Sequence, residues 1–175
     1  MRILLVAAVC AAMLATSPAA AAAAAAEDVL LDLSTPELVQ AAVQAAGYKA
    51  TLEKNDDGSL YILSAANGSD FTIDLTDCRA LKCNGLSFQS YYKPEPIFTA
   101  DFTNRWNNEK RFLKVSVNAE GELREWLNVT TLGKLTKANF ADVIDWYATM
   151  DAELAKFVKE ARDAAAAKAA PAAKK

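Results

Sequence analysis

The sequence predicts an α+β domain in which a mainly antiparallel sheet of about six strands carries its helices on one face. Apolar residues at every second position, as in residues 71–75, are typical of half-buried strands. Apolar residues at every fourth position, as at Phe98, Phe102 and Trp106, are typical of an amphipathic helix. Turn signals separate most strand segments, which favours hairpins over crossovers. The predicted order is α-β-β-β-β-α-β-β-α.

The first predicted helix begins at Ser34-Thr35-Pro36-Glu37. Ser34 and Glu37 have capping-box spacing, and proline is accepted in the first turn. The helix presents one apolar stripe, formed by Leu38, Val39, Ala42, Val43 and Ala46. Gly47 predicts its end, because glycine readily adopts the left-handed conformation that follows a last helical turn.

The remaining elements follow from the same two spacings. Four strands are predicted over residues 48–54, 60–64, 71–75 and 86–91, with turns at 55–58 and 67–68 and a cysteine loop before the fourth. A second helix is predicted from Thr99 to about Lys110, and two more strands over 111–118 and 122–129. A long third helix begins after Thr136, with its apolar face at Phe140, Val143, Ile144, Tyr147, Leu154, Phe157 and Val158.

Residues 1–26 are typical of a secretory signal peptide: one positive charge at Arg2, an apolar run over 3–14 and a small-residue region after it. The run is shorter than the roughly 20 residues that a bilayer span needs, so we expect cleavage rather than an uncleaved anchor. Loss of Arg2 takes the net charge from −3 to −4. We expect a periplasmic or secreted protein with a domain at 27–160 and an Ala- and Lys-rich flexible tail at 161–175.

The composition excludes several classes of function. An acidic mature chain does not suit nucleic-acid binding, which needs clustered Lys and Arg. The chain has no histidine, so the usual general base and the commonest metal ligand are missing. We therefore expect no catalytic residues, no metal and no cofactor. Three carboxylates, Asp70, Asp74 and Asp77, leave a carboxylate-dependent hydrolase as the less favoured alternative, because a solvated strand face is the preferred explanation for them.

Cys78 and Cys83 are the two cysteines that remain once the leader is removed. An even cysteine count in an exported domain favours a structural disulfide. The alternatives are a redox pair, which usually has two intervening residues, and a zinc site, which needs further ligands.

The segment 104–112 is the densest in functional side chains. Its candidate partner-binding residues are Arg105, Trp106, Asn107, Lys110 and Arg111. The structural interpretation is that Trp106 and Phe112 lie in the core and that the polar groups satisfy a helix end. The functional interpretation is a partner-binding edge, because Trp and Arg are enriched in interface hot spots.

Two segments of the chain carry a resemblance to a known family. One is the helix that opens with Leu33-Ser34-Thr35-Pro36-Glu37-Leu38 and ends at Ala46-Gly47-Tyr48. The other is Arg105-Trp106-Asn107-Asn108-Glu109-Lys110-Arg111-Phe112. With these segments the chain resembles the YbjN-domain family over roughly residues 31–158. This family is described as bacterial sensory-transduction regulators, and its fold is similar to that of type III secretion chaperones. The resemblance implies an often paired α+β domain that binds other proteins, with a cysteine pair in exported members.

These observations together predict an exported, non-catalytic protein-binding module that acts as a chaperone or regulator in the bacterial envelope. Its expected partner is a protein or peptide, with a homodimer as one form. Weak membrane or cell-wall contact through Lys168, Lys174 and Lys175 is a further expectation. The alternative is a structural envelope protein tethered by its leader or its tail.

Overall fold

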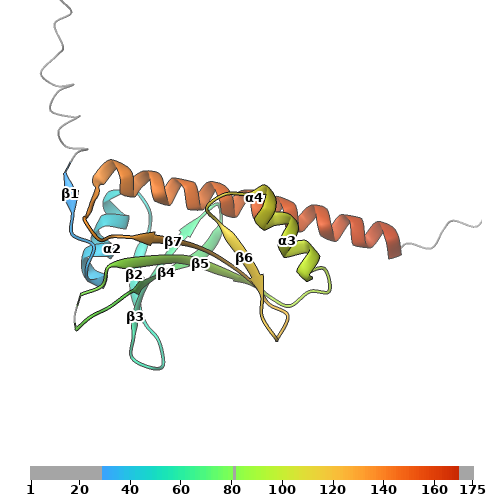
Figure 1. Cartoon of the computed structure of the whole chain (residues 1–175), viewed down its shortest axis with the longest axis horizontal. Coiled ribbons are helices and arrows are strands. Elements are labelled where there is room, and N and C mark those ends of the chain that lie inside the picture. Colours follow the sequence, from blue (N-terminus) through green and yellow to red (C-terminus); the bar gives the residue numbers. More distant parts are fainter. Residues whose placement is uncertain (1–28, 81, 170–175) are drawn as a thin grey trace, which may run out of the picture.

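A six-stranded antiparallel sheet forms one layer of the protein, and the helices form the other (Figure 1). The computed structural model describes residues 29–80 and 82–169. The strands are β2 (Ala50–Lys54), β3 (Leu60–Ala66), β4 (Ser69–Thr76), β5 (Gly85–Tyr92), β6 (Lys114–Val117) and β7 (Leu123–Thr130). Their spatial order is β2-β3-β4-β5-β7-β6, and every hydrogen-bonded pair is antiparallel. The predicted α+β class is therefore confirmed.

One connection is not a hairpin. The chain leaves β5, forms α3 (Ala100–Glu109) and enters β6 at the far edge, and β7 then returns into the gap between them. Since β7 is antiparallel to both neighbours, β5 and β6 run parallel. The expectation that hairpins join all the strands is wrong at this point, because α3 carries the chain across the face of the sheet. This crossover places the end of α3 beside the edge strand β6.

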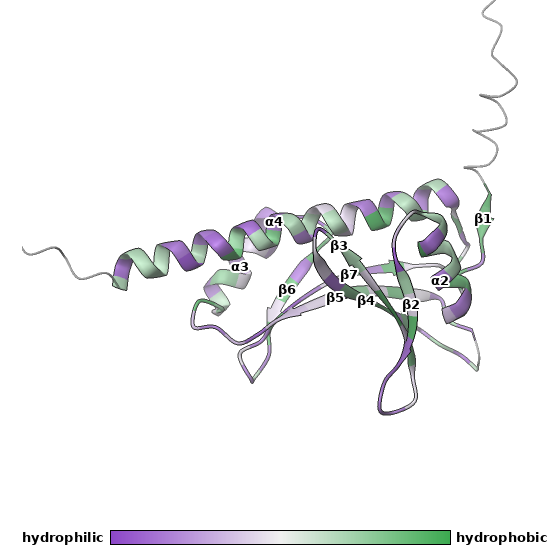
Figure 2. Ribbon diagram, turned by 180° about the vertical axis from the view of Figure 1, so that it is seen from behind, coloured by the Kyte–Doolittle hydropathy of each residue, from purple (hydrophilic) through white to green (hydrophobic). Residues whose placement is uncertain are grey.

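The three helices of the described residues share one side of the sheet (Figure 1). They are α2 (Pro36–Ala45), α3 and α4 (Lys137–Ala169). In Figure 2, apolar and polar colours alternate along α4, as expected for a helix with one face on the sheet. Its fully buried side chains include Ile144, Tyr147 and Leu154, which pack with Phe88 of β5 in one continuous core.

The hairpin turns follow the predicted chemistry. Asn67 and Gly68 have φ values of 54° and 82°, the left-handed pair that a two-residue turn requires. Gly47 has a φ of 92° directly after α2, as predicted for its termination.

The start of α2 differs from the prediction. Thr35 rather than Ser34 is the N-cap, Pro36 opens the helix, and no side chain caps it. Ser34 instead lies in the segment that meets the cysteine loop, where its carbonyl oxygen accepts a hydrogen bond from the Cys83 amide at 2.9 Å. A two-stranded sheet of β1 (Leu30–Leu31) and β8 (Leu135–Thr136) was also not predicted, because two-residue strands carry no periodicity.

The last helix is longer than expected. It continues through Ala161 to Ala169, where the sequence predicts a flexible tail at 161–175; residues 170–175 lie outside the described range. Alanine has the highest helix propensity, and Arg162 holds the extension to Glu95 through two hydrogen bonds of 2.9 and 2.5 Å. This part of α4 extends beyond the sheet (Figure 1).

The predicted signal peptide also lies outside the described residues. Within residues 29–80 and 82–169, no helix combines the length and the apolar character needed to cross a bilayer.

Shortening a core side chain of α4 tests the packing of the two layers. We expect Leu154→Ala to lower the free energy of unfolding by about 2–5 kcal/mol, because Leu154 is fully buried and its loss leaves a cavity. The matched control Lys156→Ala lies on the exposed side of the same helix and should change stability by less than about 0.5 kcal/mol. Urea unfolding of both variants provides the measurement, and equal midpoints would contradict the packing described here.

Candidate protein-binding site at the α3–β6 junction

Trp106 is the anchor of the predicted binding segment, and it is buried. Its side chain is 0 % exposed, and its indole nitrogen donates to the Leu113 carbonyl oxygen at 3.1 Å. Its ring lies 5.6 Å from that of Phe157 on α4. The structure thus confirms the core interpretation of Trp106, which ties α3, the junction and α4 together.

Asn107 closes the edge of the sheet. Its carboxamide both donates to and accepts from the Val115 backbone, at 2.9 and 3.0 Å. These two bonds occupy the backbone N–H and C=O of Val115 on the edge strand β6, which would otherwise be open to pairing with another strand. Lys114 completes the junction: its amine donates to the Asn107 and Lys110 carbonyl oxygens at the end of α3, both at 3.1 Å, where a cation is favourable.

The three predicted cations occupy different positions. Arg105 is exposed and stacks over the Phe157 ring at 4.9 Å, beside a groove of about 470 Å³ between α3 and α4. Lys110 bridges to Glu153 on α4 at 2.6 Å and is partly exposed. Arg111 is exposed. Partner binding by these residues stays a prediction.

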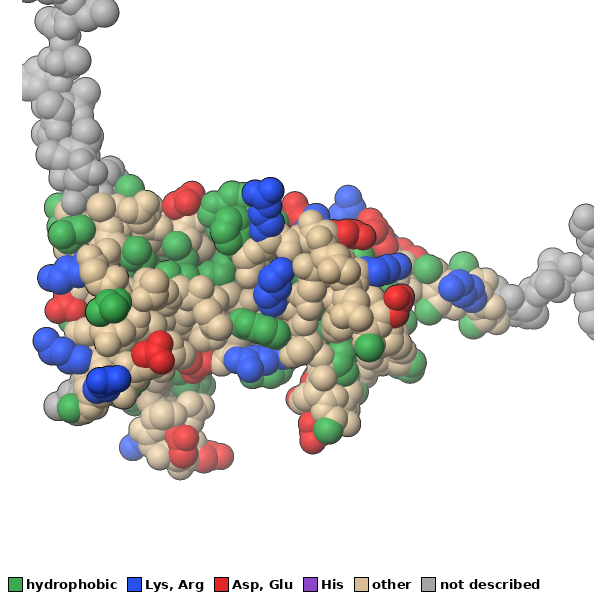
Figure 3. All heavy atoms as spheres, in the orientation of Figure 1, with side chains coloured by type: hydrophobic (Ala, Val, Ile, Leu, Met, Phe, Trp, Pro, Cys, Tyr) green, Lys and Arg blue, Asp and Glu red, His purple; other side chains and the backbone are tan. Residues whose placement is uncertain are grey.

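Phe112 and Trp146 form an exposed aromatic pair that the sequence did not predict. Phe112 was expected in the core, but it is 56 % exposed, and Trp146 of α4 is 43 % exposed. Their ring centroids lie 5.2 Å apart. Figure 3 shows an apolar patch at this junction, beside α4, with Lys and Arg side chains next to it. The spacing of α4 gave a signal, because Trp146 falls outside the apolar stripe through Val143, Ile144 and Tyr147.

The backbone of Phe112 adopts a conformation that an aromatic residue rarely takes. Its φ is +61°, in the left-handed region that favours Gly, Asn and Asp. The conformation costs about 1–2 kcal/mol. The neighbouring anchors Trp106 and Leu113, both fully buried, hold the short junction in place. The result is an exposed apolar side chain maintained at a cost to folding.

Beneath α4, a cluster of acidic and phenolic groups is buried, and the hydrogen bond within it comes from a phenol rather than from a cation. Glu125 of β7 is 0 % exposed and points into the core. The Tyr147 hydroxyl of α4 donates to Glu125 Oε1 at 2.9 Å. Oε2 has no hydrogen-bond partner among the described residues. Asp151, one turn along α4, is 7 % exposed. In addition to burial, its negative charge and its side-chain contact both raise the pKa of Glu125.

Burial dominates the protonation of this cluster. Burial, with a smaller contribution from the negative charge of Asp151, raises the pKa of Glu125 to about 8. Burial also raises the pKa of Asp151, against interactions with the Glu125 and Asn67 side chains that lower it. One signal for Glu125 was present in the strand pattern: it occupies the inward position between Leu123 and Leu127, where the alternation predicts an apolar residue.

None of the helices in residues 29–80 and 82–169 lies over the opposite face of the sheet (Figure 1). On this face, the Gln89 carboxamide donates a hydrogen bond to Asp74 and accepts one from Arg124. The Arg124 guanidinium also lies over the rings of Trp126 and Tyr91, at 5.4 and 5.9 Å. Asp74, one of the three carboxylates considered for hydrolysis, is thus held in a polar network. Burial raises its pKa, against the charge of Arg124.

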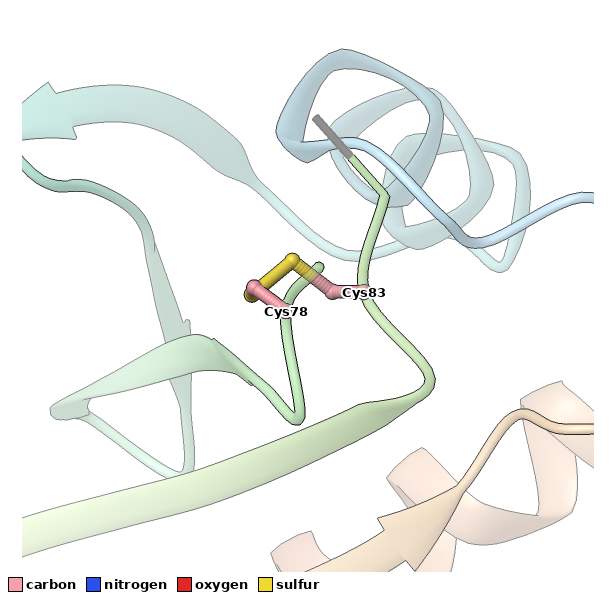
Figure 4. Close-up of a disulfide and its surroundings, with 2 residues drawn as sticks. All are labelled: Cys78 and Cys83. Carbon is pink, nitrogen blue, oxygen red and sulfur yellow. A yellow bond between two sulfur atoms is a disulfide. The ribbon is translucent and has the colours of Figure 1, made fainter. Parts of the chain in front are cut away.

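Cys78 and Cys83 form a disulfide between the end of β4 and the start of β5 (Figure 4). Cys83 is buried and Cys78 is exposed. Among the residues that the structure covers, no three acidic or cysteine side chains gather in a way that could hold a metal ion.

The fold and the junction together define a helix-on-sheet module with a buried tryptophan clasp and an exposed aromatic pair. A family model described as "Putative bacterial sensory transduction regulator" matches residues 35–160, more than half of the chain. The protein therefore belongs to the YbjN family, whose description names a regulator rather than an enzyme. Comparisons with curated proteins and with solved structures gave no significant match, so the likeness to type III secretion chaperones stays a prediction.

Replacing the indole of Trp106 tests the clasp. We expect Trp106→Phe to lower the free energy of unfolding by about 2–4 kcal/mol, because it removes core volume and leaves the buried Leu113 carbonyl oxygen without its donor. Trp126→Phe makes the same chemical change on the half-exposed outer face and should cost under about 1 kcal/mol. Similar losses in the two variants, measured by urea unfolding, would show that the clasp has no special importance.

Proposed function

We propose that the protein is an exported, non-catalytic protein-binding module of the bacterial envelope, and that the Phe112–Trp146 pair is the centre of its binding surface. The observation that carries the proposal is the exposed aromatic ring held on a left-handed backbone. Folding alone would favour Asn or Gly at this position. Strained residues that persist at exposed positions are concentrated at functional sites, so the cost points to a role outside folding.

The surroundings of the pair suit a protein partner. Large aromatic side chains with a nearby arginine are the residues that dominate the binding energy of protein interfaces. Arg111 and Lys110 border the pair, and Lys110 is already bridged to Glu153. An apolar segment flanked by acidic residues fits this surface best, because it would cover the rings and meet Arg111.

Export is supported by the leader pattern of residues 1–26 and by the disulfide, since disulfides persist mainly in oxidising compartments. The family description as a regulator is compatible with a protein that acts by binding another. A homodimer through the same pair is one form of this function.

The test uses a variant that removes the ring without disturbing the backbone. Phe112→Asn deletes the aromatic contact but suits the left-handed conformation, so stability should change by less than about 1 kcal/mol because the two effects oppose each other. Binding should fall about tenfold or more, as for a hot-spot residue. The measurement is quantitative affinity capture from the envelope fraction, followed by titration of the captured partner.

Leu132→Asn is the matched control, because Leu132 is 74 % exposed near the disulfide rather than at the junction. It should retain the partner. If wild type and Phe112→Asn capture the same proteins in the same amounts, or if wild type captures none stoichiometrically and is monomeric, the proposed surface is wrong.

A further inference from the structure

We infer that Glu125 and Asp151 form a buried proton-binding site that couples the seating of α4 on the sheet to the pH around the protein. The site itself is independent of the proposed function. Its consequence for partner binding, through Trp146 on the same helix, rests on that function.

The geometry places two acids from different layers against each other. Glu125 comes from β7, where it faces Ser90 of β5 and Val115 of β6 in the strand register. Asp151 comes from α4 and is 93 % buried by the same core. Tyr147 fills the position one turn before Asp151 and donates to Glu125 Oε1 at 2.9 Å. One oxygen of Glu125 is therefore satisfied and the other is not.

Within the part of the chain that the structure describes, the groups that act on the pair include no balancing cation. Tyr92 of β5 interacts with both acids and is itself kept neutral, because burial raises its pKa. Asn67, in the β3–β4 turn, donates to the Ala148 carbonyl oxygen at 2.7 Å and hydrogen-bonds Asp151. The cation that acts nearby is Arg162, through Tyr92, and its guanidinium is bound to Glu95 at the surface.

A proton on Glu125 gives its unpaired Oε2 atom a hydrogen-bond partner. Two adjacent ionised carboxylates in a buried site repel each other and lose their hydration, so one of them retains a proton. A proton on Glu125 Oε2 makes that oxygen a donor, and Asp151 is the acceptor beside it. The protonated pair then links β7 to α4 by a hydrogen bond in addition to the Tyr147 bond.

The raised pKa of Glu125 determines how the free energy of unfolding changes with pH. The folded protein holds a proton on this pair at pH values where the unfolded chain, with an ordinary Glu pKa near 4.5, has released it. Stability from the pair is therefore complete below that value and is lost as pH rises towards the folded pKa of about 8. The groups with lowered pKa values, Asp32, Asp57 and Glu95, act in the opposite sense at lower pH.

Loss of the proton weakens the contact between α4 and the sheet at the point where α4 also carries the binding surface. Trp146 is adjacent to Tyr147 in the sequence and faces outward to Phe112 at 5.2 Å. Glu153, two residues after Asp151, holds Lys110 at 2.6 Å. A helix that loosens around Tyr147 and Asp151 also releases the two outward contacts that define the junction surface.

The test compares the unfolding of the purified protein with that of Glu125→Gln and Glu120→Gln across pH 5 to 8. In wild type, the ratio of folded to unfolded molecules should fall by up to tenfold per pH unit, as one released proton requires. Glu125→Gln keeps a donor amide and removes the titration of Glu125, so its stability should depend much less on pH than that of wild type over this range. Asp74 and Asp151, whose pKa values burial also raises, are present in both proteins. Glu120→Gln changes an exposed acid in the β6–β7 turn and should follow wild type.

A second measurement keeps the inference testable if Glu125→Gln does not fold. Carbon-detected NMR of the side-chain carboxyl groups in wild type should show Glu125 titrating above pH 6. Amide exchange in α4 around residues 146–151, corrected for the intrinsic pH effect, should accelerate on the same titration. Titration of Glu125 in the ordinary range, or equal pH slopes in wild type and Glu125→Gln, would overturn the inference.

These measurements use no partner. Failure of Phe112→Asn to alter binding would leave the proton site intact, whereas a normal Glu125 titration would leave the proposed binding surface intact. If both hold, the affinity of the captured partner should weaken from pH 6 to pH 8.5 in wild type and stay constant in Glu125→Gln.

Discussion

The packing of α4 against the inner face of the sheet is the interaction on which the other features depend. The helix supplies the largest share of the buried side chains opposite β5 and β7, including Phe140, Tyr147 and Leu154. The same helix reaches the α3–β6 junction by stacking Phe157 on Trp106 and by presenting Trp146 to Phe112. Because α2, α3 and α4 lie on one side of the sheet, α4 determines both the core and the surface that is left exposed at its edge.

The most specific segment of the sequence, residues 105–112, has a structural purpose that explains its composition. Trp106 bonds to the backbone of Leu113, just before β6, and Asn107 bonds to the backbone of Val115 within β6. This arrangement allows a helix to end directly at a sheet edge and to close that edge. It also forces the chain through the left-handed conformation at Phe112, so the binding surface that we propose is a consequence of the clasp.

The sequence predicted the elements well because most of them have one apolar face, and the spacing along β4 or along α3 identifies such a face directly. It failed where contacts between distant segments decide the outcome. Phe112 looks like a core residue by composition, and only the clasp turns it outward. Glu125 occupies a core position that the alternation assigns to an apolar residue, and its acidic neighbour lies 26 positions away on α4. The extension of α4 past Ala161 depends on Arg162 meeting Glu95.

The most direct test of the central claim, that the junction surface meets a protein partner, is site-specific photo-crosslinking in the living cell. A photoreactive phenylalanine analogue is placed at Phe112 in one strain and at Leu132, which is more exposed but far from the junction, in another. The account predicts a discrete protein adduct from position 112 and none of that mass from position 132. No adduct at position 112, or the same adducts at both positions, would contradict it.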